Sequence, residues 1–218
     1  AMEDPNPLVA GKGLARLRAS GLTVDGPLLQ AQAAALNPGF IKRMTQGLPW
    51  VRCKLGMSLD GRTAMQSGDS QWITGSAARD DVQRWRARSC AVLTGIGTVL
   101  HDDPSLTVRL ADYQAPQPLR VVADSEGRMR PTARMLDLPG SVLLACGPAA
   151  ASYLQKNEVC SSGLRADCTI AAVPLVNGKL NLRALLQRLA SDWQCNEVLV
   201  EAGATLTGAL LQAGLVDE

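Results

Sequence analysis

The sequence predicts an α/β protein built on a mostly parallel central sheet flanked by helices. Short apolar runs of strand length alternate with amphipathic segments of helix length from residue 49 onward. Most of the apolar runs end in polar or glycine-containing turns, where ligands usually meet an α/β sheet. With 46% hydrophobic and 19% charged residues among 218, the composition is that of an ordinary globular protein.

The expected elements follow from these runs. Strands are expected at 50–57, 90–93, 119–123, 141–146 and 197–200. Helices are expected at 76–88, 149–155, 181–193 and 205–213, with Ser76 and Asn181 as N-caps. A chain of this class that stops just after a helix should continue into another strand, so we expect the last strands of the domain to lie beyond Glu218.

Residues 1–48 predict a different organisation. Helices are expected at 11–19 and 27–36, with a short strand at 22–24 between them, and Asn37-Pro38-Gly39 is expected to end the second helix. A lone strand has no sheet to join, so we interpret residues 1–48 as the end of another domain or a linker, and 49–218 as the main domain.

Charge and cysteine content exclude several classes of function. The net charge of +2 gives no reason to expect a nucleic-acid surface, and no apolar run approaches the roughly 18 residues of a membrane span. The six cysteines form no C-x-x-C pair and have only His101 as a possible histidine partner, so no metal site is expected. We expect reduced, structural thiols in a cytoplasmic protein.

Two glycine-containing turns are candidates for phosphate binding. Gly95-Ile96-Gly97 follows a strand, but it lacks the third glycine of a dinucleotide fingerprint, so a structural turn is about equally favoured. The run Glu201–Ala209 opens a helix directly after a strand, which points backbone amides and the helix dipole at any ligand beyond the sheet. Close helix-on-strand packing through its glycines explains that run equally well.

Several charged residues could serve a ligand or could be ordinary surface and turn residues. Arg86 and Arg109 could hold a phosphate bidentately, although a single arginine is more often a surface charge. Lys54 lies mid-strand among apolar neighbours, where a lysine is costly without a partner or a task. Asp102-Asp103 before a proline is typical of a turn, and His101 of a surface position.

Several blocks carry a resemblance to a known family. They are KLGMSLDGRTAMQSGDSQWIT, the helix with Arg86, TGIGTVLHDDPSLTVR, VVADSEGR and VEAGATLTGALL. In this order and spacing they resemble the reductase domain of the bifunctional riboflavin-biosynthesis deaminase/reductases, over about residues 49–218. MEDPNPLVAGKGLARLRASG resembles the end of that family's zinc deaminase domain, whose H-x-E and P-C-x-x-C signature is absent here. Zinc and the hydrolase activity would therefore belong only to a deaminase domain that this sequence lacks.

The resemblance implies a dihydrofolate-reductase-like fold and an NADPH-dependent oxidoreductase. Its reaction would reduce the ribosyl group of 5-amino-6-(5-phosphoribosylamino)uracil to ribityl by hydride delivery to C1′. The residues implied to bind the cofactor are Gly56, Trp72, Thr98, Asp102, Ser125, Gly203, Ala204, Thr205, Leu206, Thr207, Gly208 and Ala209. The residues implied to bind the substrate are Ser70, Arg86, Leu106, Arg109 and Glu201. The resemblance also implies a homodimer.

Two residues are candidates for catalysis and one for cofactor choice. Lys54 and Asp102 are candidates for assisting ring opening or stabilising charge at C1′. Ser125 is interpreted as facing the adenosine ribose, with Asp124 pointing away, so that Ser125 and nearby Arg128 or Arg130 favour NADPH over NADH. The alternatives are a cap for the turn at Ser125, a pterin reductase of the dihydrofolate-reductase type, and a truncated fragment without activity.

Overall fold

The computed structural model describes residues 2–67, 73–157, 160 and 165–218. By internal contacts it separates into two compact units, one of residues up to 50 with 186–196, the other of 51–185 with 197–218. None of the helices in the described residues is long and apolar enough to cross a membrane.

The first unit contains short helices. They are α1 (Lys12–Ala19), α2 (Gln30–Ala35) and α3 (Pro38–Gln46). The strand expected at 22–24 is wrong, since these residues form no strand. The expected stop at Asn37-Pro38-Gly39 ends α2 but begins α3, because a proline at the first helical position lacks only an amide hydrogen that would be unpaired there anyway.

The second unit is organised around a parallel sheet. Within the described residues the sheet has six strands in the order β1-β8-β2-β3-β4-β5. Their bounds are β1 (Trp50–Cys53), β2 (Ala91–Gly95), β3 (Leu119–Asp124), β4 (Gly140–Cys146), β5 (Ala166–Ala172) and β8 (Glu197–Val200). The pairs β8–β2, β2–β3, β3–β4 and β4–β5 are all parallel. This confirms the predicted α/β class.

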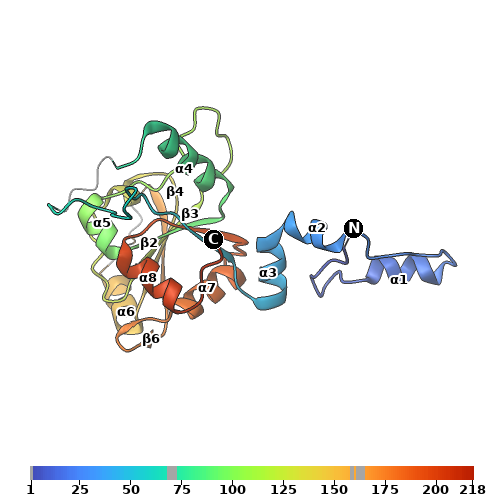
Figure 1. The fold of residues 1–218 in the computed structure, drawn as a ribbon. Helices are drawn as coiled ribbons and strands as arrows, with labels where there is room; N and C mark the ends of the chain where they lie inside the picture. The colour runs from blue at the N-terminus through green and yellow to red at the C-terminus, as the bar shows by residue number, and fades with distance from the viewer. Residues whose placement is uncertain (1, 68–72, 158–159, 161–164) are drawn as a thin grey trace. The chain divides into compact units, whose positions relative to one another are not determined.

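Helices pack on both faces of this sheet, and Figure 1 shows α5, α6 and α8 beside its strands. The remaining elements are α4 (Ser76–Arg88), α5 (Ile96–Asp102), the 3₁₀ turn η1 (Arg134–Asp137), α6 (Pro148–Lys156), the hairpin strands β6 (Leu175–Val176) and β7 (Lys179–Leu180), α7 (Leu182–Ser191) and α8 (Ala204–Gln212). The N-cap predicted at Asn181 is confirmed, because its side chain accepts the Ala184 amide at 3.0 Å. The cap predicted at Ser76 is wrong, since Gly75 precedes the helix and Ser76 is its first residue.

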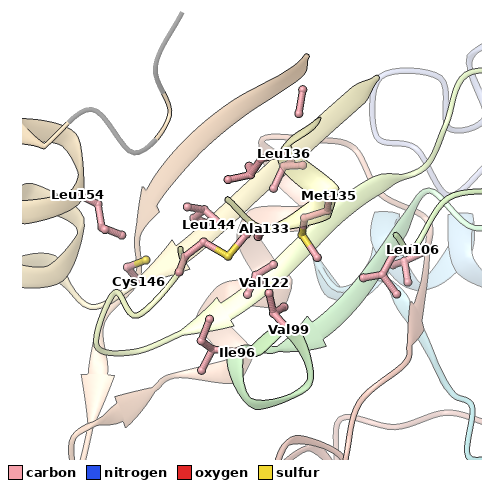
Figure 2. Close-up of a cluster of buried hydrophobic side chains, with 14 of the residues drawn as sticks. Ile96, Val99, Leu106, Val122, Ala133, Met135, Leu136, Leu144, Cys146 and Leu154 are labelled. Atoms are coloured by element: carbon pink, nitrogen blue, oxygen red, sulfur yellow. The ribbon is translucent and has the colours of Figure 1, made fainter. Parts of the chain in front are cut away.

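The main core lies between one face of the sheet and α5, η1 and α6. Figure 2 shows Ile96 and Val99 of α5 beside Val122, with Leu144 on the next strand. Val92, Val122 and Leu144 share this face because alternate residues of a strand point the same way and the strands are in parallel register. The core therefore fixes α5 on one face and leaves the ends of β2 and β3 free to carry polar residues.

Two buried charged residues sit on the same face of β3. Arg120 is fully buried and donates to the backbone carbonyls of Met135, Leu138, Pro139 and Gly140 at 2.7–3.1 Å. Asp124, also fully buried, accepts the Met129 amide at 2.8 Å. Burial lowers the pKa of Arg120, since its charge is removed from water.

Two of the cysteines differ from the expected reduced state. Cys160 and Cys168 form a disulfide, with Cα atoms 5.2 Å apart, so the expectation of six reduced thiols is wrong for this pair. The two cysteines are eight residues apart and form no C-x-x-C pair, so their spacing did not indicate the bond. Cys146 is free and buried, and burial, followed by the nearby charge of Asp124, raises its pKa to about 12.

Candidate functional site

A cavity of about 840 Å³ opens at the carboxyl ends of the strands in the second unit. Lys54 follows β1, Glu201 follows β8, Gly95 ends β2 and Ser125 follows β3, and all of them line the cavity. The sheet order therefore places these turns side by side along one edge, which is where ligands bind in open α/β sheets. A volume near 840 Å³ is in the range of small-molecule and cofactor sites.

In the middle of this edge the connections change from one face of the sheet to the other. β2 and β8 are neighbours, but the helices that follow them pack on opposite faces of the sheet. Ile96 of α5 belongs to the core on the Val92 face, whereas Leu206 of α8 lies on the other face, where a Cβ added at Gly95 would be 3.7 Å from it. Where the helices after two neighbouring strands leave to opposite faces, a crevice opens between the strand ends. The position of the cavity therefore follows from the strand order.

Lys54 stands at the β1 end of the cavity. Its amide donates to the carbonyl of Val200 at 3.0 Å, and its Nζ lies 3.6 Å from the position that a Cβ on Gly56 would occupy. Lys54 was expected in the middle of a strand, but β1 ends at Cys53, so this lysine begins the turn after the strand, reaches Gly56 and lines the cavity. A side chain at Gly56 would contact the ammonium group.

Arg86 and Glu201 form a buried ion pair at the same end. Arg86 Nε and Nη2 donate to the two Glu201 carboxylate oxygens at 2.6 and 2.9 Å, and Nη1 donates to the Thr107 carbonyl at 2.9 Å. The two side chains are only 10% and 12% exposed. One guanidinium therefore joins α4, the end of β8 and the segment after α5, and positions Leu106, which is buried with a φ of 52°.

Arg109 lies near this pair but does not line the cavity in this structure. Burial and then the positive charge of Arg86 lower the pKa of Arg109, while Glu201 opposes the shift. Its amide donates to the Gln83 side chain at 2.9 Å, which ties the segment after α5 to α4. The structure thus brings Arg86, Leu106 and Glu201 together, with Arg109 at their edge.

The turn between β8 and α8 supplies backbone amides. Gly203 precedes α8 in an extended conformation, and among the described residues no side chain caps the helix. Of the predicted run, Gly203, Ala204, Thr205, Leu206 and Ala209 line the cavity. Thr207 is instead buried, with its hydroxyl 3.5 Å from the Ala202 carbonyl, and Gly208 does not line the cavity.

The turn after β3 forms the opposite side. Asp124 points into the core and accepts the Met129 amide, whereas Ser125 lines the cavity. The Ser125 hydroxyl oxygen accepts the Leu180 amide at 3.2 Å. Ser125 is thus partly used to bind another segment of the chain.

Helix α5 contributes residues that were predicted and one that was not. Thr98 and Asp102 both line the cavity, and Asp102 is exposed. His101, interpreted as a plain surface residue, also lines the cavity, although it too is exposed. Their helix was not predicted, because Gly95-Ile96-Gly97 was read only as a turn.

Other lining residues escaped the sequence interpretation. Arg79 of α4, Glu126, and Lys179 and Leu180 of the hairpin line the cavity, together with Arg128, which the sequence interpretation had already placed near Ser125. A signal for the hairpin was present, since Asn-Gly between two short apolar runs favours a two-residue turn. Trp72 and Ser70, predicted to bind cofactor and substrate, lie outside the described residues. Among the residues that the structure describes, no group of three His, Cys, Asp or Glu could hold a metal ion.

Sequence comparison decides the family. A family model described as the RibD C-terminal domain matches residues 49–218. The chain belongs to the RibD C-terminal domain family. Riboflavin biosynthesis protein RibD of Escherichia coli (strain K12) is 44% identical over 229 residues, covering 100% of this chain and 59% of that protein. The RibD of Haemophilus influenzae is 43% identical, with 58% of that protein covered.

Solved structures agree with the RibD assignment. Acinetobacter baumannii RibD, form 2, superposes with a TM-score of 0.83 at 44% identity, covering 100% of this chain and 57% of that one. A Thermotoga maritima diaminohydroxyphosphoribosylaminopyrimidine deaminase/5-amino-6-(5-phosphoribosylamino)uracil reductase gives 0.75 at 28% identity, covering 97% and 55%. The chain spans a little over half the length of these relatives. It is homologous to the reductase domain of RibD, which confirms the resemblance and its dihydrofolate-reductase-like α/β fold.

Proposed function

We propose that this chain carries the NADPH-dependent reduction of 5-amino-6-(5-phosphoribosylamino)uracil to its ribitylamino product. The observation that carries the proposal is the cavity at the strand ends, in which residues from all five sequence blocks meet. Gly56, Thr98, Asp102, Ser125 and the start of α8 would hold the cofactor. Arg86, Leu106 and Glu201 lie in the same cavity, so a substrate there would be adjacent. Hydride transfer depends mainly on such positioning.

The cavity suits a phosphate-containing cofactor. The first-turn amides of α8 face it with no side-chain cap among the described residues, and a Cβ at Gly97 or Gly203 would meet nothing within 4 Å. Backbone could therefore be approached closely at both turns, and the α8 N-terminus favours an anion. When bound, NADPH would supply the hydride. The chain's own residues would bind the cofactor and substrate, orient them toward each other and exclude water.

The substrate phosphate would be held at the β1 and β8 end. Glu201 already neutralises Arg86, so Arg86 chiefly keeps Glu201 and the Leu106 segment in place. Arg109, close enough for Arg86 to lower its pKa, has no such bidentate partner among the described residues, and it would turn toward the phosphate. Glu201 would accept hydrogen bonds from the sugar hydroxyls.

Lys54 and Asp102 would serve the reacting end of the sugar. Lys54 Nζ would donate a hydrogen bond to the ring oxygen as its bond to C1′ breaks, and Asp102 would accept one from a sugar hydroxyl. Both line the cavity, from the end of β1 and from α5 respectively. A cation at that oxygen favours ring opening because it stabilises developing negative charge.

The proposed function also implies a domain organisation and an oligomeric state. Residues 1–48 would be the end of a preceding deaminase domain and a linker, and the reductase unit would pair as a homodimer. Sedimentation of the purified chain tests the pairing, with a single species of monomer mass contradicting it.

Cofactor oxidation tests the proposed reaction. The purified chain, mixed with NADPH and the ribosylaminopyrimidine phosphate, should lose reduced-nicotinamide absorbance and form the ribityl product. The dephosphorylated substrate should react much more slowly, whereas a pterin reductase would reduce dihydropterins and ignore the phosphate. Binding of both ligands without turnover would place this chain among inactive fragments, and binding of neither would contradict the proposal.

A further inference from the structure

The hairpin β6–β7 carries a lysine whose position is fixed by its turn. Leu175–Val176 and Lys179–Leu180 pair antiparallel around Asn177 and Gly178, which have φ values of 52° and 74°. Positive φ at both central residues defines the type I′ class of two-residue hairpin, and Asn-Gly is its preferred sequence. Lys179 comes directly after this turn, opposite Val176, so the tight turn sets where its side chain begins.

The hairpin is closed at its base by one hydrogen bond and is held against the turns that follow β3 and β4 by two further contacts. The Leu180 amide donates to Ser125 Oγ at 3.2 Å, and the Asn181 amide donates to the Pro174 carbonyl at 2.8 Å. Leu175 packs on Gly147, where an added Cβ would lie 2.9 Å from Leu175 Cδ1 and 2.9 Å from the Ser125 carbonyl oxygen. The hairpin and the β3 turn therefore form one wall of the cavity.

The two cations on this wall, Arg128 and Lys179, differ in whether a carboxylate lies beside them. Arg128 Nε lies 3.5 Å from Glu126 Oε2, so a carboxylate partly neutralises it. Lys179 lines the cavity beside them, and no carboxylate of the described residues forms an ion pair with it. Ser125 Oγ already accepts one amide but keeps its hydroxyl hydrogen to donate. This wall therefore offers an anion a lysine and a hydroxyl.

The sheet order decides which part of a dinucleotide would lie here. The Arg86–Glu201 pair and Lys54 lie at the ends of β8 and β1, and the nicotinamide must reach a substrate there. Ser125 follows β3, which is three strands from β1, about 14 Å along the edge at the usual strand spacing. The adenosine end of the cofactor would therefore lie against the hairpin wall.

We propose that Lys179 is the residue that selects NADPH over NADH, by binding the adenosine 2′-phosphate together with the Ser125 hydroxyl. This inference rests on the proposed function and shifts the main cation from Arg128 or Arg130 to the hairpin. Arg130 does not line the cavity, and Arg128 has a carboxylate neighbour. The Leu180–Ser125 hydrogen bond would keep the lysine and the hydroxyl together.

Calorimetric binding of nucleotide fragments tests Lys179 without any turnover. Adenosine 2′,5′-bisphosphate and adenosine 5′-monophosphate are titrated into the wild-type chain, Lys179→Met and Lys179→Arg. Lys179→Met should weaken bisphosphate binding about 10- to 100-fold, the range for a lost charge-assisted hydrogen bond, and leave monophosphate binding within about twofold. Lys179→Arg should restore most of the bisphosphate affinity. Lys156→Met, an exposed lysine of α6 outside the cavity, removes the same charge and should change neither.

Each result separates this proposal from the proposed function. Unchanged bisphosphate binding in Lys179→Met would overturn the role of Lys179 and leave NADPH use standing. Equal losses for both fragments would also overturn it, since that pattern indicates a displaced hairpin rather than a lost phosphate contact. A wild-type chain that binds neither the bisphosphate nor NADPH would overturn both.

Discussion

Arg86 and Arg120 are both buried cations in the second unit, but their surroundings differ. Arg86 is buried at the edge of the cavity and is neutralised by a carboxylate, Glu201, through two short hydrogen bonds. Arg120 is fully buried in the core and donates only to backbone carbonyls between η1 and β4. Arg86 stabilises the shape of a ligand-sized cavity, whereas Arg120 stabilises the segment from η1 to the start of β4.

The partner of a buried cation indicates whether the cation serves folding alone or also a binding site. A cation satisfied by carbonyl dipoles can fix a loop without any second ionisable group, and its removal should affect folding alone. A cation satisfied by a carboxylate creates a pair whose members can also meet polar groups of a ligand. Removing either member leaves the other charge buried and unpaired, which is usually costlier than the pair itself is stabilising.

Removal of Arg120 should have the largest effect. Arg120→Met leaves the carbonyls of Met135, Leu138, Pro139 and Gly140 without their donor, so we expect the free energy of unfolding to fall by about 3–5 kcal/mol. Denaturant unfolding followed by circular dichroism measures it. Arg134→Met on the exposed side of η1 serves as the control and should cost less than about 1 kcal/mol. Equal stabilities of the two variants would show that Arg120 does not organise this segment.

The Arg86–Glu201 pair should give the next largest effect, on both folding and binding. Arg86→Met should lower the free energy of unfolding by about 3 kcal/mol, because Glu201 remains as a buried unpaired charge. The double variant Arg86→Met/Glu201→Gln should recover most of that stability but not substrate binding. If the double variant is no more stable than Arg86→Met, the two side chains are not coupled and the pair is not what positions the site.

Arg109 should affect binding alone. Arg109→Ala should weaken substrate binding by about 2 kcal/mol, the scale of one charge-assisted contact to phosphate, while the free energy of unfolding and NADPH affinity stay nearly unchanged. Titration of wild type and variant with the phosphorylated and dephosphorylated substrates measures the contact. A loss of NADPH affinity with normal substrate binding would mean that the two halves of the site have been assigned the wrong way round.

The sequence predicted most of the sheet because its strands are short apolar runs. β2, β3, β4 and β8 all lie close to where those runs fall. β5 (Ala166–Ala172) was missed because it is the edge strand and its small, partly exposed residues carry no continuous apolar signal. Helix α5 was missed because it is only seven residues long and contains Gly97 two residues after its N-cap Gly95, so it is too short for a helical period to show.

The site was predictable only in part. The Arg86–Glu201 pair joins residues 115 positions apart, and no local pattern reports such a pair. Arg120, in contrast, interrupts an apolar run of the sequence just as Lys54 does, and the same argument from burial would have marked it as a buried cation with a task. What the sequence lacks is the direction of each side chain: Lys54 lines the cavity, whereas Arg120 lies in the core.

Lys54 offers the smallest expected effect and sharpens the contrast between the two kinds of cation. It is only half-buried, and its Nζ has no carboxylate partner among the described residues, so Lys54→Met should change the free energy of unfolding by less than about 1 kcal/mol. If Lys54 stabilises the negative charge on the departing ring oxygen mainly in the transition state, kcat should fall about tenfold or more while KM changes little. Steady-state kinetics at saturating NADPH gives both constants, and Lys54→Arg, which keeps the charge, should recover part of kcat. An unchanged kcat in Lys54→Met would leave Lys54 as a residue that only covers Gly56, and the cavity would then need another group to assist ring opening.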